Sequence, residues 1–226
     1  MISFLRKIFQ FGPGKTGNAQ AGREMTPSEL GYDFLTLGTE GSSPTKVGEN
    51  NIKYNPNLVV TLKKQHKKLV VLFLDVEKLV KEGLDLINQN GDPNIKFDLA
   101  HQVLNQFLQL LKNHVIVENL LLYSYLRKND PKKDVVSLQG QMRAIQRAVI
   151  DFTDVYVKLG FTPRNAQDFL DTWVGVDGFG DVAKISRANS MKSILTSRIS
   201  TEEEDGLYMA YDSIGTSETE ISNIAV

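Results

Sequence analysis

The stretch LKNHVIVENLLLYSYL, residues 111–126, decides the fold. Its apolar residues follow a helical spacing, yet His114 and Glu118 stand at positions where a helix packed in a bundle needs core side chains. Residues four apart project from the same helix face, so the imidazole and the carboxylate are expected side by side. The same seam reads Phe97, Ala100, Leu104, Phe107 and Leu111 before this pair, and Leu121 and Tyr125 after it.

Helix-breaking residues on either side of this stretch divide the chain after residue 55 into helices. Pro56, Gly91-Asp92-Pro93 and Asp130-Pro131 mark helix starts and turns, and glycines between 175 and 180 precede the last helix. Four long helices joined by short turns predict an all-α protein, an antiparallel up-and-down four-helix bundle with a short extra helix between the third and fourth long helices. The expected long helices are 55–89, 95–128, 131–159 and 181–214, and the extra helix is 162–174.

The other long helices show comparable seams. The first reads Val59, Leu62, His66, Leu69, Phe73, Val76 and Val80; the third reads Val135, Leu138, Met142, Ile145, Val149, Phe152, Tyr156 and Leu159; the last reads Met191, Leu195, Arg198 and Glu202 towards Gly206 and Met209. Ionisable residues therefore interrupt the predicted core in three helices, and the third helix is the exception.

The ionisable core residues are expected at one level along the axis of the predicted bundle. His66 precedes Gly91 by 25 residues (91 − 66) and His114 follows it by 23 (114 − 91). In an antiparallel pair the two imidazoles then lie within roughly 3 Å of the same level, at 1.5 Å per residue. Arg198 and Glu202 repeat the spacing of His114 and Glu118 on the last helix.

Two explanations account for these buried charges, which are costly unless they are paired or bound to a metal. One is a metal site, in which His66, His114, Glu118 and Glu202 offer two nitrogen and two oxygen ligands that suit iron, manganese or zinc. The other is a salt-bridge layer without metal, in which Arg198 lies between the two carboxylates. His101 lies about 140° around the helix from His114 and is expected on the surface or flank. No catalytic residues are predicted.

Composition excludes several classes of function. The chain has no cysteine, which rules out disulfides, thiolate metal sites and cysteine nucleophiles, and its net charge of -1 argues against nucleic-acid binding. No apolar run reaches the roughly 20 residues of a membrane span, and no secretory signal is recognisable, so a cytoplasmic location is expected. An enzyme is less favoured than a binding or sensing protein, and a protein partner is an open alternative.

The chain is expected to divide into a flexible or partly disordered, glycine-rich N-terminal region (1–50), the bundle (51–214) and a polar C-terminal tail (215–226). Residues 1–11 have one apolar helical face interrupted by two cations. Such a short segment binds membranes weakly, and packing on its own domain is the preferred interpretation.

Three segments resemble hemerythrin-like (HHE cation-binding) domains. KKQHKKL (63–69) is similar to their first-helix histidine motif, residues 111–126 to their His-x-x-x-Glu motif followed by Leu-Tyr-x-Tyr-Leu, and RISTEEEDGLY (198–208) to their last-helix motif. Arg198 stands where that family usually has histidine, and the third-helix histidine is absent.

The resemblance implies a four-helix bundle that holds non-haem iron for oxygen binding, oxygen or redox sensing, or iron handling. Carried over by position, it implies the metal ligands His66, His114, Glu118 and Glu202. The chain has three histidines, too few for the family's full set of about five. We therefore expect a reduced, one-metal or partial iron site in a metal-binding or oxygen/redox-sensing protein, with a metal-free regulatory bundle that binds another protein as the alternative.

Overall fold

The computed structural model describes residues 53–130, 145–176, 178, 180–204 and 206–224, with side chains described as far as residue 217. Regular structure within these residues is entirely helical, which confirms the expected all-α class. None of the helices described is both long enough and apolar enough to cross a membrane. The helices are α2 (Leu58–Asn88), α3 (Asn94–Val117), the π-helical η3 (Glu118–Tyr123), α4 (Ser124–Asn129), the π-helical η4 (Thr153–Val157), α6 (Ala166–Trp173), α7 (Asp181–Asn189), α8 (Met191–Glu203) and α9 (Leu207–Ile224), with a further helical stretch over 145–152.

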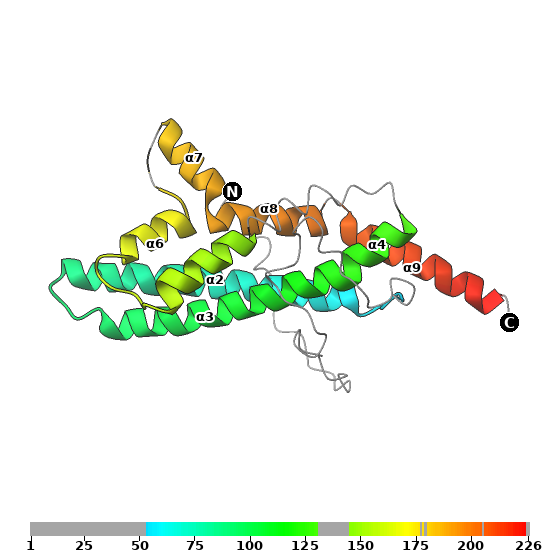
Figure 1. Ribbon diagram of the computed structural model, residues 1–226, viewed down its shortest axis with the longest axis horizontal. Helices are drawn as coiled ribbons and strands as arrows, with labels where there is room; N and C mark the ends of the chain where they lie inside the picture. The colour runs from blue at the N-terminus through cyan, green and yellow to red at the C-terminus, as the bar shows by residue number, and fades with distance from the viewer. Residues whose placement is uncertain (1–52, 131–144, 177, 179, 205, 225–226) are drawn as a thin grey trace, which may run out of the picture.

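Helices α2 and α3 form a long antiparallel pair (Figure 1). The turn between them uses the predicted breaker residues: Asn90 adopts a left-handed φ of 56°, and the Gly91 N–H donates to the Leu86 carbonyl at 2.7 Å. Asp92 Oδ1 then accepts the Asn94 N–H at 2.9 Å, where α3 begins. The predicted seam of α2 is buried throughout, and that of α3 is buried as far as Glu118 in η3.

The π-helical turn η3 changes which residues face the core. A π-helix closes its hydrogen bonds over five residues instead of four, so side chains beyond it move around the axis. The predicted seam residue Leu121 is 38% exposed, while Leu122 and Tyr123 are buried. The prediction for Leu121 was wrong because regular helical spacing does not continue through η3. Tyr125, in α4, is buried as predicted.

The described half of the third helix runs through 145–152 and η4. Ile145, Val149, Phe152 and Tyr156 are buried as predicted, whereas Val135, Leu138 and Met142 lie outside the described residues. Leu159 is 74% exposed, contrary to the prediction, because the helix has already ended in a turn. The extra helix is confirmed as α6.

The expected continuous helix over 181–214 is wrong, because the chain breaks twice. Ser190 adopts an extended backbone (φ -70°, ψ 155°) and its Oγ accepts the Ser193 N–H, so it ends α7 and caps α8. The second break includes Gly206, whose φ of 80° is a left-handed conformation that favours glycine. Met209 is 70% exposed instead of buried, because α9 starts a new helical phase and buries Tyr208 and Tyr211.

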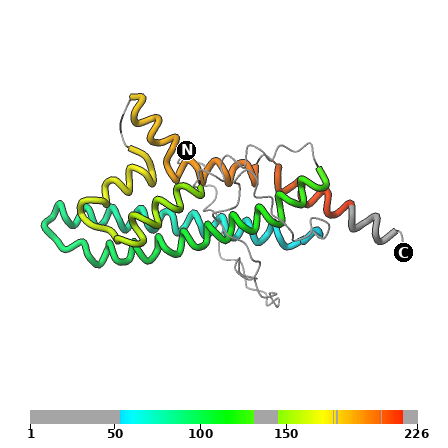
Figure 2. The backbone as a smooth tube through the Cα atoms, viewed as in Figure 1, coloured from blue at the N-terminus to red at the C-terminus, as the bar shows by residue number. Residues whose placement is uncertain are grey.

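The elements that run lengthwise are α2, α3 with its continuation through α4, the stretch 145–157, and α8 followed by α9, while α7 projects from them (Figure 2). Helix α9 packs against α4 and continues to Ile224, past the boundary expected at residue 214. The first half of the expected third helix and the expected N-terminal region (1–50) lie outside the described residues. The closed up-and-down four-helix arrangement therefore stays a prediction.

An aromatic cluster joins α6 to the long helices. Trp173 stacks on Phe73 of α2 with ring centroids 4.5 Å apart, and its indole N–H donates to the Phe73 carbonyl at 3.2 Å. Phe107 of α3 and Phe152 meet the same indole edge to face, with centroids 5.0 and 5.1 Å away. Trp173 is fully buried, so the packing of α6 against the long helices depends on it.

We expect Trp173→Ala to lower the free energy of unfolding by about 3–5 kcal/mol, because it empties the centre of the aromatic cluster. Leu159→Ala is the control, since that side chain is exposed and its loss should change stability by less than about 0.5 kcal/mol. Urea denaturation followed by circular dichroism measures both. Equal effects of the two substitutions would contradict the assignment of Trp173 to the core.

Candidate metal centre

The four residues predicted as metal ligands converge in the core. His66 comes from α2, His114 from α3, Glu118 from η3 and Glu202 from α8, and none is more than 2% exposed. One ligand atom from each lies within 4.8 Å of the others. Together with Arg198 of α8, which is 1% exposed, they form what we call the polar layer. The predicted common level of the two histidines is confirmed by their ring centroids, which are 4.5 Å apart.

Arg198 points into the core and occupies one side of the polar layer. Its Nε lies 3.0 Å from Glu202 Oε1 and donates to Glu118 Oε2 at 3.2 Å, and its Nη2 also donates to Glu118 Oε2. The same Nη2 donates to the Tyr123 hydroxyl at 2.8 Å, and that hydroxyl in turn donates to Glu202 Oε1. One guanidinium thus holds one oxygen of each carboxylate.

The two histidines occupy the other side of the polar layer and face the remaining carboxylate oxygens. His114 Nε2 lies 2.8 Å from Glu118 Oε1, and His66 Nε2 lies 3.1 Å from Glu202 Oε2 and 3.7 Å from Glu118 Oε1. The two carboxylates therefore bridge two positions for positive charge. Arg198 takes the first, and the imidazoles frame the second.

Outer partners orient both imidazoles. His66 Nδ1 lies 2.7 Å from Glu203 Oε1, and His114 Nδ1 lies 2.8 Å from Gln65 Oε1. Both partners are oxygen acceptors, so each Nδ1 carries hydrogen. A metal-bound histidine almost always donates its outer ring N–H to such an oxygen, which leaves the other nitrogen free to ligate. Each Nε2 of this layer points inward in that manner.

The inner atoms of the layer are incompletely satisfied by the protein. His114 Nε2, Glu202 Oε2 and Arg198 Nη1 are buried and make no well-directed hydrogen bond among the described residues, although the first two lie 2.8 Å from Glu118 Oε1 and 3.1 Å from His66 Nε2. Buried polar atoms without partners are rare in folded proteins and call for an explanation such as an ion. Two inward nitrogens and two inward oxygens with oriented outer partners are a donor set that fits one iron, manganese or zinc ion.

The charges of the layer act strongly on one another. Burial favours a neutral imidazole, but Glu118, Glu202 and Glu203 outweigh that effect and raise the pKa of His66 to about 11. Burial also opposes ionisation of Glu118, but Arg198 and the histidines hold the pKa of that carboxyl well below its usual value. Burial raises the pKa of Glu202, and Glu118 adds to this effect although Arg198 opposes it. Without a metal ion, the carboxylates thus hold a positive charge on His66, on the histidine side of the layer.

Two buried tyrosines were not predicted as part of the site. Tyr123 follows the change of phase in η3, and Tyr208 lies in the turn of helix that follows Gly206. The Tyr208 hydroxyl donates to Glu118 Oε1 at 3.3 Å and lies 3.4 Å from His66 Nε2. Regular helical spacing does not predict that either tyrosine faces the core. Only Gly206 gives a sequence signal, for the break between α8 and α9 that turns Tyr208 inward.

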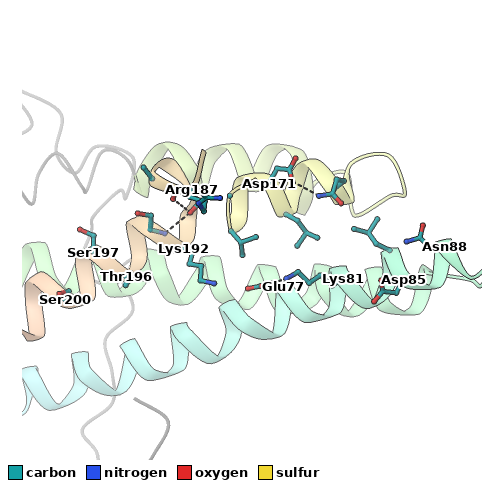
Figure 3. Close-up of a pocket in the computed structure, with 18 of the residues that line it drawn as sticks. Glu77, Lys81, Asp85, Asn88, Asp171, Arg187, Lys192, Thr196, Ser197 and Ser200 are labelled. Atoms are coloured by element: carbon teal, nitrogen blue, oxygen red, sulfur yellow. Dashed lines mark hydrogen bonds and ion pairs between the residues drawn. The ribbon is translucent and has the colours of Figure 1, made fainter. Parts of the chain in front are cut away.

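Other candidate features lie away from the polar layer. His101 is half-buried, and its Nε2 lies 2.8 Å from the Val157 carbonyl, on the flank as expected. A groove of about 1060 Å³ lies between α2, α6, α7 and α8, lined by residues such as Lys81, Asp171 and Arg187 (Figure 3). None of the layer residues lines that groove.

Comparison with protein families gives a match over most of the described residues. The model of the hemerythrin HHE cation binding domain matches residues 57–210 of the chain, which include the whole polar layer and Tyr208. Neither the curated proteins nor the solved structures that were compared give a match.

We expect Arg198→Met to lower the free energy of unfolding of the metal-free protein by about 3–5 kcal/mol, because it leaves two buried carboxylates without their cation. Lys158→Met is the control: that lysine pairs with Asp154 on the surface, and its loss should cost less than about 0.5 kcal/mol. Thermal and urea denaturation in the presence of a chelator measure both. A neutral Arg198→Met would contradict the pairing described above.

Proposed function

The chain belongs to the hemerythrin HHE cation-binding domain family, and from that premise we propose that it binds one non-haem iron ion in the polar layer and serves as an oxygen or redox sensor. The ion would be held by His66 Nε2, His114 Nε2, Glu118 Oε1 and Glu202 Oε2. The observation that carries the proposal is the convergence of these four buried donor atoms within 4.8 Å of one another, of which His114 Nε2 and Glu202 Oε2 make no well-directed hydrogen bond.

The position of Arg198 favours one bound metal ion over two. It already neutralises the outer oxygens Glu118 Oε2 and Glu202 Oε1, which a second metal ion would need. A guanidinium does not lose its charge at ordinary pH, so the repulsion it exerts on a second cation is permanent. The sensor would therefore keep one fixed positive charge and one exchangeable charge on opposite sides of the same carboxylates.

Iron in such a donor set supplies a one-electron change between the ferrous and ferric states. The protein supplies the surroundings: the layer is buried, and Gln65 and Glu203 hold the imidazoles in the ligating orientation. Glu203 is the last residue of α8, close to the break before α9. A change in the charge next to His66 would therefore alter its contact with Glu203 at the junction between α8 and α9. Such a link between the ion and a helix junction suits a sensor.

We expect iron(II) under anaerobic conditions to raise the melting temperature of the wild-type protein, with about one iron per chain by elemental analysis. A hundredfold excess over the dissociation constant adds about 2.7 kcal/mol to the free energy of unfolding. His114→Gln should abolish the increase, because it removes a ligand nitrogen. Oxidation of the loaded protein by ferricyanide should shift the melting temperature again.

His101→Gln is the matched control, since this third histidine lies outside the layer and its substitution should leave iron binding intact. A wild type that binds no iron and melts at the same temperature with and without it would contradict the proposal. That result would favour the alternative, a metal-free regulatory bundle stabilised by Arg198 that binds another protein.

We expect Arg198→His to raise the iron content above one per chain and towards two. The substitution removes the fixed cation between Glu118 Oε2 and Glu202 Oε1 and offers an imidazole in its place. Elemental analysis of wild type and variant, loaded side by side, measures the change. An unchanged content of one iron in a folded variant would show that the guanidinium is not what limits the site to a single ion.

A further inference from the structure

Tyr208 completes the histidine side of the polar layer. Its hydroxyl lies 3.3 Å from Glu118 Oε1 and 3.4 Å from His66 Nε2, which are two of the four inward donor atoms. Its ring stacks on the His66 ring, with centroids 5.9 Å apart and an interplanar angle of 19°. The residue is 1% exposed, so the hydroxyl is directed at the layer and not at solvent.

Tyr123 is an internal contrast within the same layer. Its hydroxyl contacts Arg198 Nη2 and Glu202 Oε1, which belong to the guanidinium side. Each position for positive charge therefore has one tyrosine hydroxyl beside it. On the guanidinium side the hydroxyl accepts from a cation that is already present, whereas the Tyr208 hydroxyl lies beside the position framed by imidazoles.

We propose that Tyr208 is a fifth ligand, which binds ferric iron through its phenolate oxygen. The proposal rests on the proposed function, because it needs an iron ion held by His66, His114, Glu118 and Glu202. It adds a preference between oxidation states, since an anionic phenolate oxygen stabilises ferric iron more than ferrous iron.

Charge balance explains why the phenolate would form on oxidation. Loss of one electron from iron(II) adds one positive charge to a buried layer, and an uncompensated buried charge is costly. In the step we propose, one electron passes from iron to an external one-electron oxidant, the O–H bond of Tyr208 breaks, its proton goes to the solvent, and the oxygen binds iron(III). The total charge of the layer is then the same before and after oxidation.

Without a metal ion the same residue stays a phenol. Burial raises the pKa of Tyr208 far above its ordinary value, and Glu118 and Glu202 add to that rise. The hydroxyl then serves as a donor to Glu118 Oε1, which is the contact that the structure shows. Tyr208 thus has a distinct role in each state: a hydrogen-bond donor in the metal-free layer and a ligand in the ferric one.

The test uses the full chain loaded with iron(II) without oxygen and then oxidised with ferricyanide. A phenolate bound to iron(III) has a charge-transfer band in the visible spectrum, which imidazole and carboxylate ligands alone do not have. We expect the oxidised wild type to show this band, with tyrosinate vibrations enhanced in its resonance Raman spectrum. Tyr208→Phe should lose the band completely, and Tyr123→Phe should keep it.

Elemental analysis distinguishes failure of the proposed iron binding from failure of the Tyr208 assignment. Wild-type protein that takes up no iron contradicts the proposed function and the ligand assignment with it. Protein that holds one iron but lacks the band after oxidation contradicts the Tyr208 assignment alone, whereas iron that ferricyanide does not oxidise contradicts the redox-sensing proposal as well. A band that persists in Tyr208→Phe overturns the assignment too. If Tyr208→Phe does not fold, the wild-type Raman spectrum and Tyr123→Phe together still decide the question, because loss of the band in Tyr123→Phe would overturn the assignment.

Discussion

The pairing of Arg198 with Glu118 and Glu202 is the interaction on which the core of this protein depends. Three fully buried charged groups would be strongly destabilising if any one were unpaired, so α8 and η3 must meet in one register. That register also aligns the carboxylates with the imidazoles of α2 and α3. The guanidinium therefore does two things at once: it holds the helices together and it determines which carboxylate oxygens remain available on the histidine side.

A carboxylate has two oxygens, and the layer uses them for different tasks. In each glutamate, one oxygen is committed to a permanent cation and the other faces an imidazole Nε2. Such an arrangement pairs the carboxylates with a cation of the protein itself and still leaves four donor atoms within 4.8 Å of one another. The two explanations that the sequence left open, a salt-bridge layer and a metal site, are therefore compatible, since each accounts for one side of the same two carboxylates.

The polar residues of this core were readable from the sequence because regular helices repeat. His66, His114, Glu118, Arg198 and Glu202 stand at seam positions, and one turn of known location placed the two histidines at a common level. Prediction failed wherever the backbone departed from regular helix. The π-helical turn η3 exposed Leu121 and buried Tyr123, and the breaks at Ser190 and Gly206 divided the last helix, so that Met209 faces outward and Tyr208 inward. Gln65 and Glu203 were missed because outer partners leave no periodic signal.

These irregular places are also where the layer acquires its tyrosines. Tyr123 enters through a π-helical turn, a feature found frequently at functional sites, and Tyr208 enters just after a glycine with positive φ. In an unbroken α-helix, Glu202 and Tyr208 would be six residues apart and would point to different faces. The break between α8 and α9 brings both to one layer, since each contacts His66. The irregular backbone thus allows a layer with few histidines to gather further oxygen atoms around the position that the imidazoles frame.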